Sequence, residues 1–268
     1  MTRAKARGMI ATILAPAASL LVGLLAWEVL VRMSHLPSYV FPSPSLVFAQ
    51  LIDNFGLLMS QLGVTIAAAS AGFLLAFVLA TIAGTLIAMS HTLDRALTPW
   101  LVVAHAVPKV VIAPLFLVWF GFGLRSEIFF VVSFTFFPMV VNTIAGLRSA
   151  DPELVEMVRS MGASDWQVLR KIRFPGALPS IFSGIKISIT LAPVGAVIGE
   201  FVASNQGLGH LLIEAVGNME TALAFAAVTV FSIFGVVVWK FAEWIERWAL
   251  PWHASQRERR RTLEHAPA

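Results

Sequence analysis

The polar segment 151-DPELVEMVRSMGASDWQVLRKIRFP-175 separates two long apolar stretches of the chain and predicts two short helices. Asp151 is an N-cap residue type, and Pro152 follows at the first helical position, where a missing N–H costs nothing. Glu153 complements the helix dipole, and Gly162 stops the helix in a left-handed turn. The first helix is therefore expected to end at a glycine turn.

The second helix is predicted to begin directly after that turn. Ser164 and Gln167 have the Ser-x-x-Gln spacing of a capping box, and Pro175 is expected to end the helix. Its apolar face is predicted from residues three positions apart, which are Trp166, Leu169 and Ile172. Its basic face is predicted from Arg170, Lys171 and Arg173. Spacing leaves two interpretations open: a knob that enters a groove on a partner, or an amphipathic hairpin that rests on anionic lipid headgroups.

The sequence around this segment predicts an all-α integral membrane protein. The chain is 58% hydrophobic and 13% charged, with a mean hydropathy of +0.82, whereas about a quarter of the residues in soluble domains are charged. Spans of ~20 residues match a hydrocarbon core ~30 Å thick. Six spans are predicted: 9–31, 63–89, 97–120, 128–145, 181–199 and 223–239.

The positions of lysine and arginine predict the orientation. With the N-terminus inside, 15 of the 19 basic residues fall in cytoplasmic segments, which the positive-inside rule favours. Residues 1–8 are then a cytoplasmic N-terminus, 9–250 a six-span domain with its cytoplasmic loop at 151–175, and 251–268 a basic cytoplasmic tail. A cleaved signal peptide is the competing interpretation of the first span, but the apolar run continues well past Ala17 and Ala18.

Several classes of function lack their sequence signals. There is no cysteine, the six histidines are scattered without metal-ligand spacing, and no Gly-Lys pair exists to form a phosphate loop. The basic residues flank apolar spans and do not alternate with aromatic residues, as nucleic-acid binding would require. We therefore predict no catalytic residue, no metal site and no nucleic-acid partner.

The cytoplasmic segment resembles the EAA loop of binding-protein-dependent ABC importers, whose pattern is Glu-Ala-Ala-x3-Gly-x9-Ile-x-Leu-Pro. Glu156, Gly162, Ile172 and Pro175 match at the family spacing. The chain departs from the pattern at Met157, Val158 and Phe174, which add bulk. Three further stretches resemble the nitrate, sulfonate and taurine branch: Phe41-Pro-Ser-Pro44, the run from Val107 to Gly123, and Gly199-Glu-Phe201 with Gly207-Leu-Gly209.

The resemblance implies a transport subunit that is not itself an enzyme, in a type I importer fold. The loop would seat in a cleft of a cytoplasmic ABC ATPase dimer, which uses the ATP, so this chain would bind no cofactor directly. The other implied partners are an external substrate-binding protein, a second copy of the chain and the lipid of a bacterial inner membrane. The implied coupling residues are Glu156, Gly162, Ala163, Ser164, Trp166, Ile172 and Pro175.

Lys109 and Lys186 fall inside apolar spans, where a charge typically costs ~2.5 to 3.5 kcal/mol. Three explanations are open: contact with an anion in the pathway, snorkelling to an interface, or pairing with a carboxylate. Span five also has small residues four apart from Ser180 to Ala196, which suggest a pathway lining or a dimer seam that includes Ser188 and Pro193. In span two, the stripe of small residues from Ala68 to Ala88 predicts helix packing.

The predicted substrate is a small, anionic solute such as nitrate, a sulfonate or taurine, as the resembled branch implies. Import of a thiamin-precursor pyrimidine by the same mechanism is the alternative. A secondary transporter or channel ranks lower, because the sequence lacks internal repeats and carboxylates within spans. A membrane enzyme would need clustered acids or nucleophiles at membrane depth, which the sequence also lacks.

Overall fold

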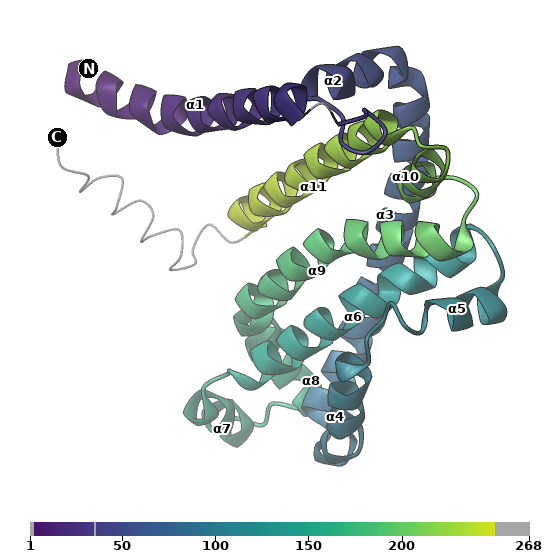
Figure 1. Cartoon of the computed structure of the whole chain (residues 1–268). Helices are drawn as coiled ribbons and strands as arrows, with labels where there is room; N and C mark the ends of the chain where they lie inside the picture. The colour runs from purple at the N-terminus through teal and green to yellow at the C-terminus, as the bar shows by residue number, and fades with distance from the viewer. Residues whose placement is uncertain (1–2, 35, 250–268) are drawn as a thin grey trace. The chain divides into compact units, whose positions relative to one another are not determined.

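The computed structural model describes residues 3–34 and 36–249, and for residues 3–17 it describes the backbone alone. All regular elements in this part of the chain are helices (Figure 1). The predicted tail at 251–268 lies outside the described residues. The helices are α1 (Arg3–Ser34), α2 (Pro44–Asp53), α3 (Phe55–Met89), α4 (His91–Ala106), α5 (Ala113–Phe120), α6 (Leu124–Arg148), α7 (Pro152–Ser160), α8 (Asp165–Val168), a π-helix (Leu169–Arg173), α9 (Phe174–Ala203), α10 (Leu208–Gly217) and α11 (Thr221–Ala249).

Four stretches of the described residues are long and apolar enough to cross a membrane. They are α3, α6, the continuous helix from Asp165 to Ala203, and α11. These long apolar helices confirm the predicted all-α membrane fold.

The predicted third span, 97–120, is an interrupted helix, as the prolines on either side of Lys109 favour. It is divided into α4 and α5 by an irregular stretch at residues 107–112. Val107 has an extended backbone (φ −66°, ψ 125°), because the ring of Pro108 disfavours a helical conformation in the residue before it. Pro114 lies in the first turn of α5, where a proline is tolerated.

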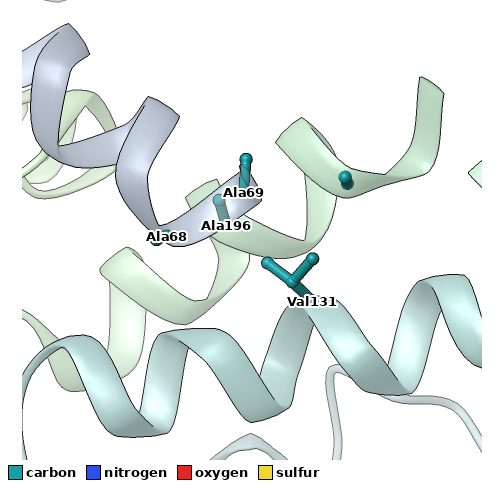
Figure 2. Close-up of a cluster of buried hydrophobic side chains, with 5 residues drawn as sticks. Ala68, Ala69, Val131 and Ala196 are labelled. Atoms are coloured by element: carbon teal, nitrogen blue, oxygen red, sulfur yellow. The ribbon is translucent and has the colours of Figure 1, made fainter. Parts of the chain in front are cut away.

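The chain forms two compact units, of which the larger comprises residues 60–210 and 231–251. Its core is the packing of α3 and α9 against α6. In Figure 2, Val131 of α6 points toward Ala68 and Ala69 of α3 and Ala196 of α9, with which it forms a buried cluster. A Cβ added at Gly84 would lie 2.8 Å from Cβ of Thr143, and one at Gly184 would lie 2.8 Å from Cβ of Asn142. The stripes of small residues in α3 and α9 therefore both pack against α6. For α3 this is the helix packing that the sequence predicted. For α9 it is packing within the chain, whereas the sequence suggested a pathway lining or a dimer seam.

Of the described residues, the smaller unit comprises 3–34, 36–59 and 211–230. Ser43 caps α2 through Leu46, and the backbone N–H and hydroxyl of Ser45 donate to the carboxylate of Glu28 in α1 at 3.0 and 2.9 Å. Rings of α1, the α1–α2 loop and α11 form a cluster of Trp27, Phe41 and Phe225, with centroids 5.6 to 6.0 Å apart. These contacts fix the loop that follows α1.

Candidate functional site

The first helix of the polar segment is α7, and both of its ends have the predicted capping interactions. The N–H of Glu153 donates to Oδ1 of Asp151 at 2.9 Å, and Pro152 occupies the first turn. At the other end, Gly162 has φ +87° and its N–H donates to the carbonyl of Arg159, while Ala163 N–H donates to Val158. This is the Schellman pattern, which requires a left-handed residue at the position of Gly162.

The second helix begins with the predicted capping box. Gln167 N–H donates to Oγ of Ser164 at 3.3 Å, and Ser164 N–H donates to Oε1 of Gln167 at 2.8 Å. An ion pair of 2.5 Å between Arg159 and Asp165 joins α7 to α8. The two helices are thus held together by caps and by a pair of charged side chains.

The prediction that Pro175 ends the second helix is wrong. The helix runs without interruption from α8 through the π-helix at Leu169–Arg173 into α9. In the π-helix the N–H of Phe174 donates five residues back, to Leu169. This wider turn accommodates Pro175, the second residue of α9, which has no N–H to donate within the continuous helix.

The exposed surface of the segment is unusually apolar for a polar loop. The exposed fraction is 79% for Met161 and 63% for Trp166, and Glu156 beside them is also exposed. Trp166, which its spacing placed on one apolar face with Leu169 and Ile172, is exposed, whereas Val168 and Leu169 are buried. A hollow of about 360 Å³ lies between the helices, lined by Val158, Met161, Gly162, Ala163, Gln167, Val168, Lys171 and Ile172.

Each residue predicted for a pathway has its own immediate contacts in the structure. Lys186 Nζ lies 2.8 Å from Glu246 of α11, which is the carboxylate pairing left open by the sequence. Ser188 is buried and donates to the carbonyl of Thr135 at 2.8 Å, and Pro193 is buried in α9. Lys109 lies in the break between α4 and α5, with Nζ 5.6 Å from the ring centroid of Phe134.

Sequence reasoning missed a polar clasp at the start of α10, which we define as Gln61 and Thr65 of α3, Glu200 of α9 and residues 207–209. Three consecutive N–H groups donate to it: Gly207 to Gln61 at 2.5 Å, Leu208 to Thr65 at 3.0 Å and Gly209 to Glu200 at 2.6 Å. These are the donors that a helix start leaves unsatisfied, and here distant side chains accept them. The Gly207-Leu-Gly209 run was the available signal.

Two contacts in the larger unit join helix ends that the predicted topology places on the same side. Arg148 at the end of α6 pairs with Asp94 of α4 at 2.9 Å, and Gly123 N–H donates to Ala203 at 2.6 Å. The hydroxyl of Thr98 and the guanidinium of Arg148 hold the pKa of Asp94 below its ordinary value.

A multi-pass bundle of apolar helices, with a capped helix-turn-helix projecting between two spans, defines a membrane permease of the ABC importer fold. The methionine ABC transporter in its inward-facing conformation has the same fold, with a TM-score of 0.64 at 19% identity over 73% of this chain and 97% of that chain. Residues 76–251 match the family model of the binding-protein-dependent transport system inner membrane component, and the chain belongs to that family.

Two curated relatives cover nearly the whole chain. The riboflavin transport system permease of Chloroflexus aurantiacus is 39% identical over 88% of this chain and 89% of its own length. The formylaminopyrimidine transport permease of Halalkalibacterium halodurans is 32% identical over 91% of this chain and 97% of its own length. The chain is thus the permease subunit of an ABC importer, without catalytic activity, and ATP hydrolysis belongs to a separate ATPase.

Proposed function

We propose that the segment 151–175 is the docking site for the cytoplasmic ATPase, and that the chain works as a six-span homodimer with an external binding protein. The supporting observation is the exposed apolar surface around Met161 and Trp166, at the tip of a helix pair whose ends are fully capped. Exposed apolar surface on a polar, rigid loop marks a protein interface. The N- and C-termini are then cytoplasmic, in a bacterial inner membrane.

The uninterrupted helix from Asp165 to Ala203 gives this site a mechanical role. At 1.5 Å per residue, its 39 residues form a rod ~58 Å long, with the docking surface at one end. A movement of the ATPase that shifts α7 and α8 would tilt the whole of α9 and its packing partner α6. The Arg159–Asp165 ion pair and the two caps keep α7 and α8 together during that movement.

Glu156→Ala is expected to lower co-purification of the ATPase by about tenfold, because an exposed carboxylate at a docked surface loses a charged contact worth ~1.4 kcal/mol or more. Gly162→Val should have the same effect through the turn, since a β-branched residue resists φ +87°. The measurement is the amount of ATPase retained on the tagged permease, with coupled uptake in proteoliposomes. Glu153→Ala, one turn earlier on α7, is the matched control. Equal retention of the ATPase by the parent permease and all three variants would contradict the proposal.

For the substrate we propose a small anionic solute, with Lys109 as its contact in the pathway. Lys109 lies where the backbone is not helical, and such breaks at membrane depth occur where they line a cavity or are buried in protein. In the described part of the chain its ammonium group has the ring of Phe134 and no ion-pair partner. A cation in this state gains most from an anionic ligand.

A nitrogen heterocycle is the second candidate substrate. The two relatives above are named for riboflavin and a formylaminopyrimidine. Near Lys109, the ring of His105 stacks on Phe137 with centroids 3.8 Å apart. Aromatic faces of this kind suit a flat heterocycle as well as a cation.

Lys109→Met is expected to lower uptake of a sulfonate at least tenfold and to leave ATPase assembly unchanged, because the methionine keeps the apolar stem and removes the charge. Lys109→Arg should retain most uptake. Lys240→Met serves as the control, since that lysine also lies over a ring, at 5.9 Å from Trp239. Normal sulfonate uptake by Lys109→Met would contradict the proposed role of Lys109 in an anion pathway. Uptake of riboflavin or an aminopyrimidine, but not of a sulfonate, by the parent protein would favour the heterocycle.

A further inference from the structure

The smaller unit has a polar hollow of about 380 Å³ between the α1–α2 loop, α2 and the start of α11. In Figure 1 this loop lies beside the first turn of α11, and the hydroxyl of Thr221 donates to the carbonyl of Tyr39. Both segments are external in the predicted topology. The residues that line the hollow are Ser38, Tyr39, Leu46, Gln50, Asn54, Met219, Glu220, Thr221, Ala222 and Leu223.

The residues that line the hollow carry negative charge and no positive charge. Glu220 is its single ionisable carboxylate, its side chain is exposed, and neither lysine nor arginine is among the lining residues. Asn54 Nδ2 donates to Oε1 of Gln50 at 2.7 Å, which leaves the amide oxygen of Asn54 as a further acceptor. Leu46 and Leu223 add apolar wall. The hollow therefore offers a carboxylate, neutral acceptors and apolar surface, which together fit an aliphatic stem that ends in a cation.

At the rim of the hollow, Met219 has a left-handed backbone conformation that is unfavourable for a residue other than glycine. Glu220 N–H donates to Ala215 at 2.7 Å and Met219 N–H donates to Val216 at 3.1 Å, so α10 ends in a Schellman pattern. Its left-handed position, where glycine is usual, is Met219 at φ 61° with 68% of its side chain exposed. Among the described residues, Met219 is the one non-glycine with positive φ. An unfavourable conformation that presents an exposed apolar side chain at a rim suggests a binding role.

We propose that this hollow receives a lysine or arginine side chain of the external substrate-binding protein, with Glu220 as its counter-charge and Met219 packed against its stem. The inference rests on the proposed function, which places such a protein on this face. Charge complementarity supports this occupant: in the predicted external stretch 200–221 the acidic residues Glu214 and Glu220 are exposed, and the stretch contains neither lysine nor arginine. A basic patch on the binding protein would then be attracted to this face by its charge, and insertion of one side chain into the hollow would fix its position.

The test uses the full permease with its ATPase in nanodiscs and the purified binding protein of the same transport system. Glu220→Lys is expected to raise the Kd for the binding protein at least tenfold, and Glu220→Gln about threefold with a weaker dependence on salt. Asp53→Lys is the matched control, because Asp53 is an exposed acid at the end of α2 that does not line the hollow. Its Kd should stay within twofold of that of the parent protein.

Met219→Gly gives an independent readout. Glycine adopts φ 61° without strain, so the melting temperature should stay the same or rise, while the loss of the side chain should raise the Kd for the binding protein about threefold. A substitution that acted only through folding would move both quantities in the unfavourable direction. A charge exchange, with Glu220→Lys set against Lys or Arg→Glu in the binding protein, should restore the affinity.

Three results would overturn the proposal. They are an unchanged Kd for Glu220→Lys, an equal weakening by Asp53→Lys, and a loss of permease dimer in place of a loss of binding-protein affinity, which would make a second copy the occupant. If the parent permease itself neither binds the purified protein nor shows ATPase stimulation by it, the proposed function fails. The two failures are therefore distinguishable.

Discussion

Gly207→Val is expected to lower the free energy of unfolding by about 4 kcal/mol or more and to leave little folded permease in detergent. Gly207 has φ +98°, which costs a β-branched residue ~1 to 2 kcal/mol. A Cβ at this position would also overlap the carboxyl group of Glu200. Its displacement would leave the N–H of Gly209 without its acceptor, at a further ~1 to 3 kcal/mol.

The buried carboxylates nearby make the clasp sensitive to small shifts. Glu200 and Glu127 have exposed fractions of 0% and 1%, and one oxygen of each has no hydrogen-bond partner within the described part of the chain. A Cβ added at Gly199 would lie 3.1 Å from Cα of Glu127, so α9 approaches α6 closely at this point. Few positions remain to which the side chain of Glu200 could move.

The experiment for Gly207 is thermal unfolding followed by size-exclusion chromatography of the detergent-solubilised protein. Gly217→Val, at the other end of α10, is the matched control, because a Cβ there meets nothing within 4 Å and no positive φ is involved. Its melting temperature should lie within a few degrees of the parent value. A Gly207→Val protein as stable as the Gly217→Val protein would show that the clasp does not hold the start of α10.

Gly72→Leu is expected to cost about 3 kcal/mol and to separate α3 from α6. A Cβ at Gly72 would overlap the side chain of Val131 and lie 2.8 Å from the carbonyl oxygen of Ile128. Backbone atoms cannot rotate away, so the helices must move apart, and overpacking of this kind costs ~1 to 3 kcal/mol or more. The contacts of Ala68 and Ala69 shown in Figure 2 would be lost with the movement.

Gly63→Leu is the control for Gly72→Leu, since Gly63 lies on the same helix and a Cβ there meets nothing within 4 Å. Melting temperatures of both variants, measured together with the parent protein, check the prediction. A second change tests the same contact: Val131→Ala should recover part of the stability lost in Gly72→Leu, because it removes Cγ1, which lies 2.7 Å from the added Cβ. A Gly72→Leu protein that melts with the control would contradict the close packing of α3 on α6.

Local signals predicted the polar segment well. Asp151, Gly162, Ser164 and Gln167 act within three or four residues of themselves, so their caps and turn could be predicted from spacing. The end of the second helix could not be predicted, because Pro175 is tolerated only after a π-turn that begins six residues earlier.

Long-range contacts explain the remaining differences. The partner of Lys186 is Glu246, 60 positions away, and the acceptors for Gly207 and Leu208 lie more than 140 positions earlier in α3. No period or motif in the sequence joins residues at such separations. The small-residue stripes were visible, but a stripe indicates that a close partner exists and not which helix it is.

The sequence by itself determined an all-helical membrane protein with a capped helix-turn-helix between two spans, because apolar run length and capping are local properties. The tertiary structure decided how α3 and α9 pack on α6, that Lys186 is paired, and that side chains of α3 and α9 satisfy the start of α10. These follow from the low-dielectric surroundings of a helix bundle, where each buried charge and each free N–H needs a partner and only the packing can supply one.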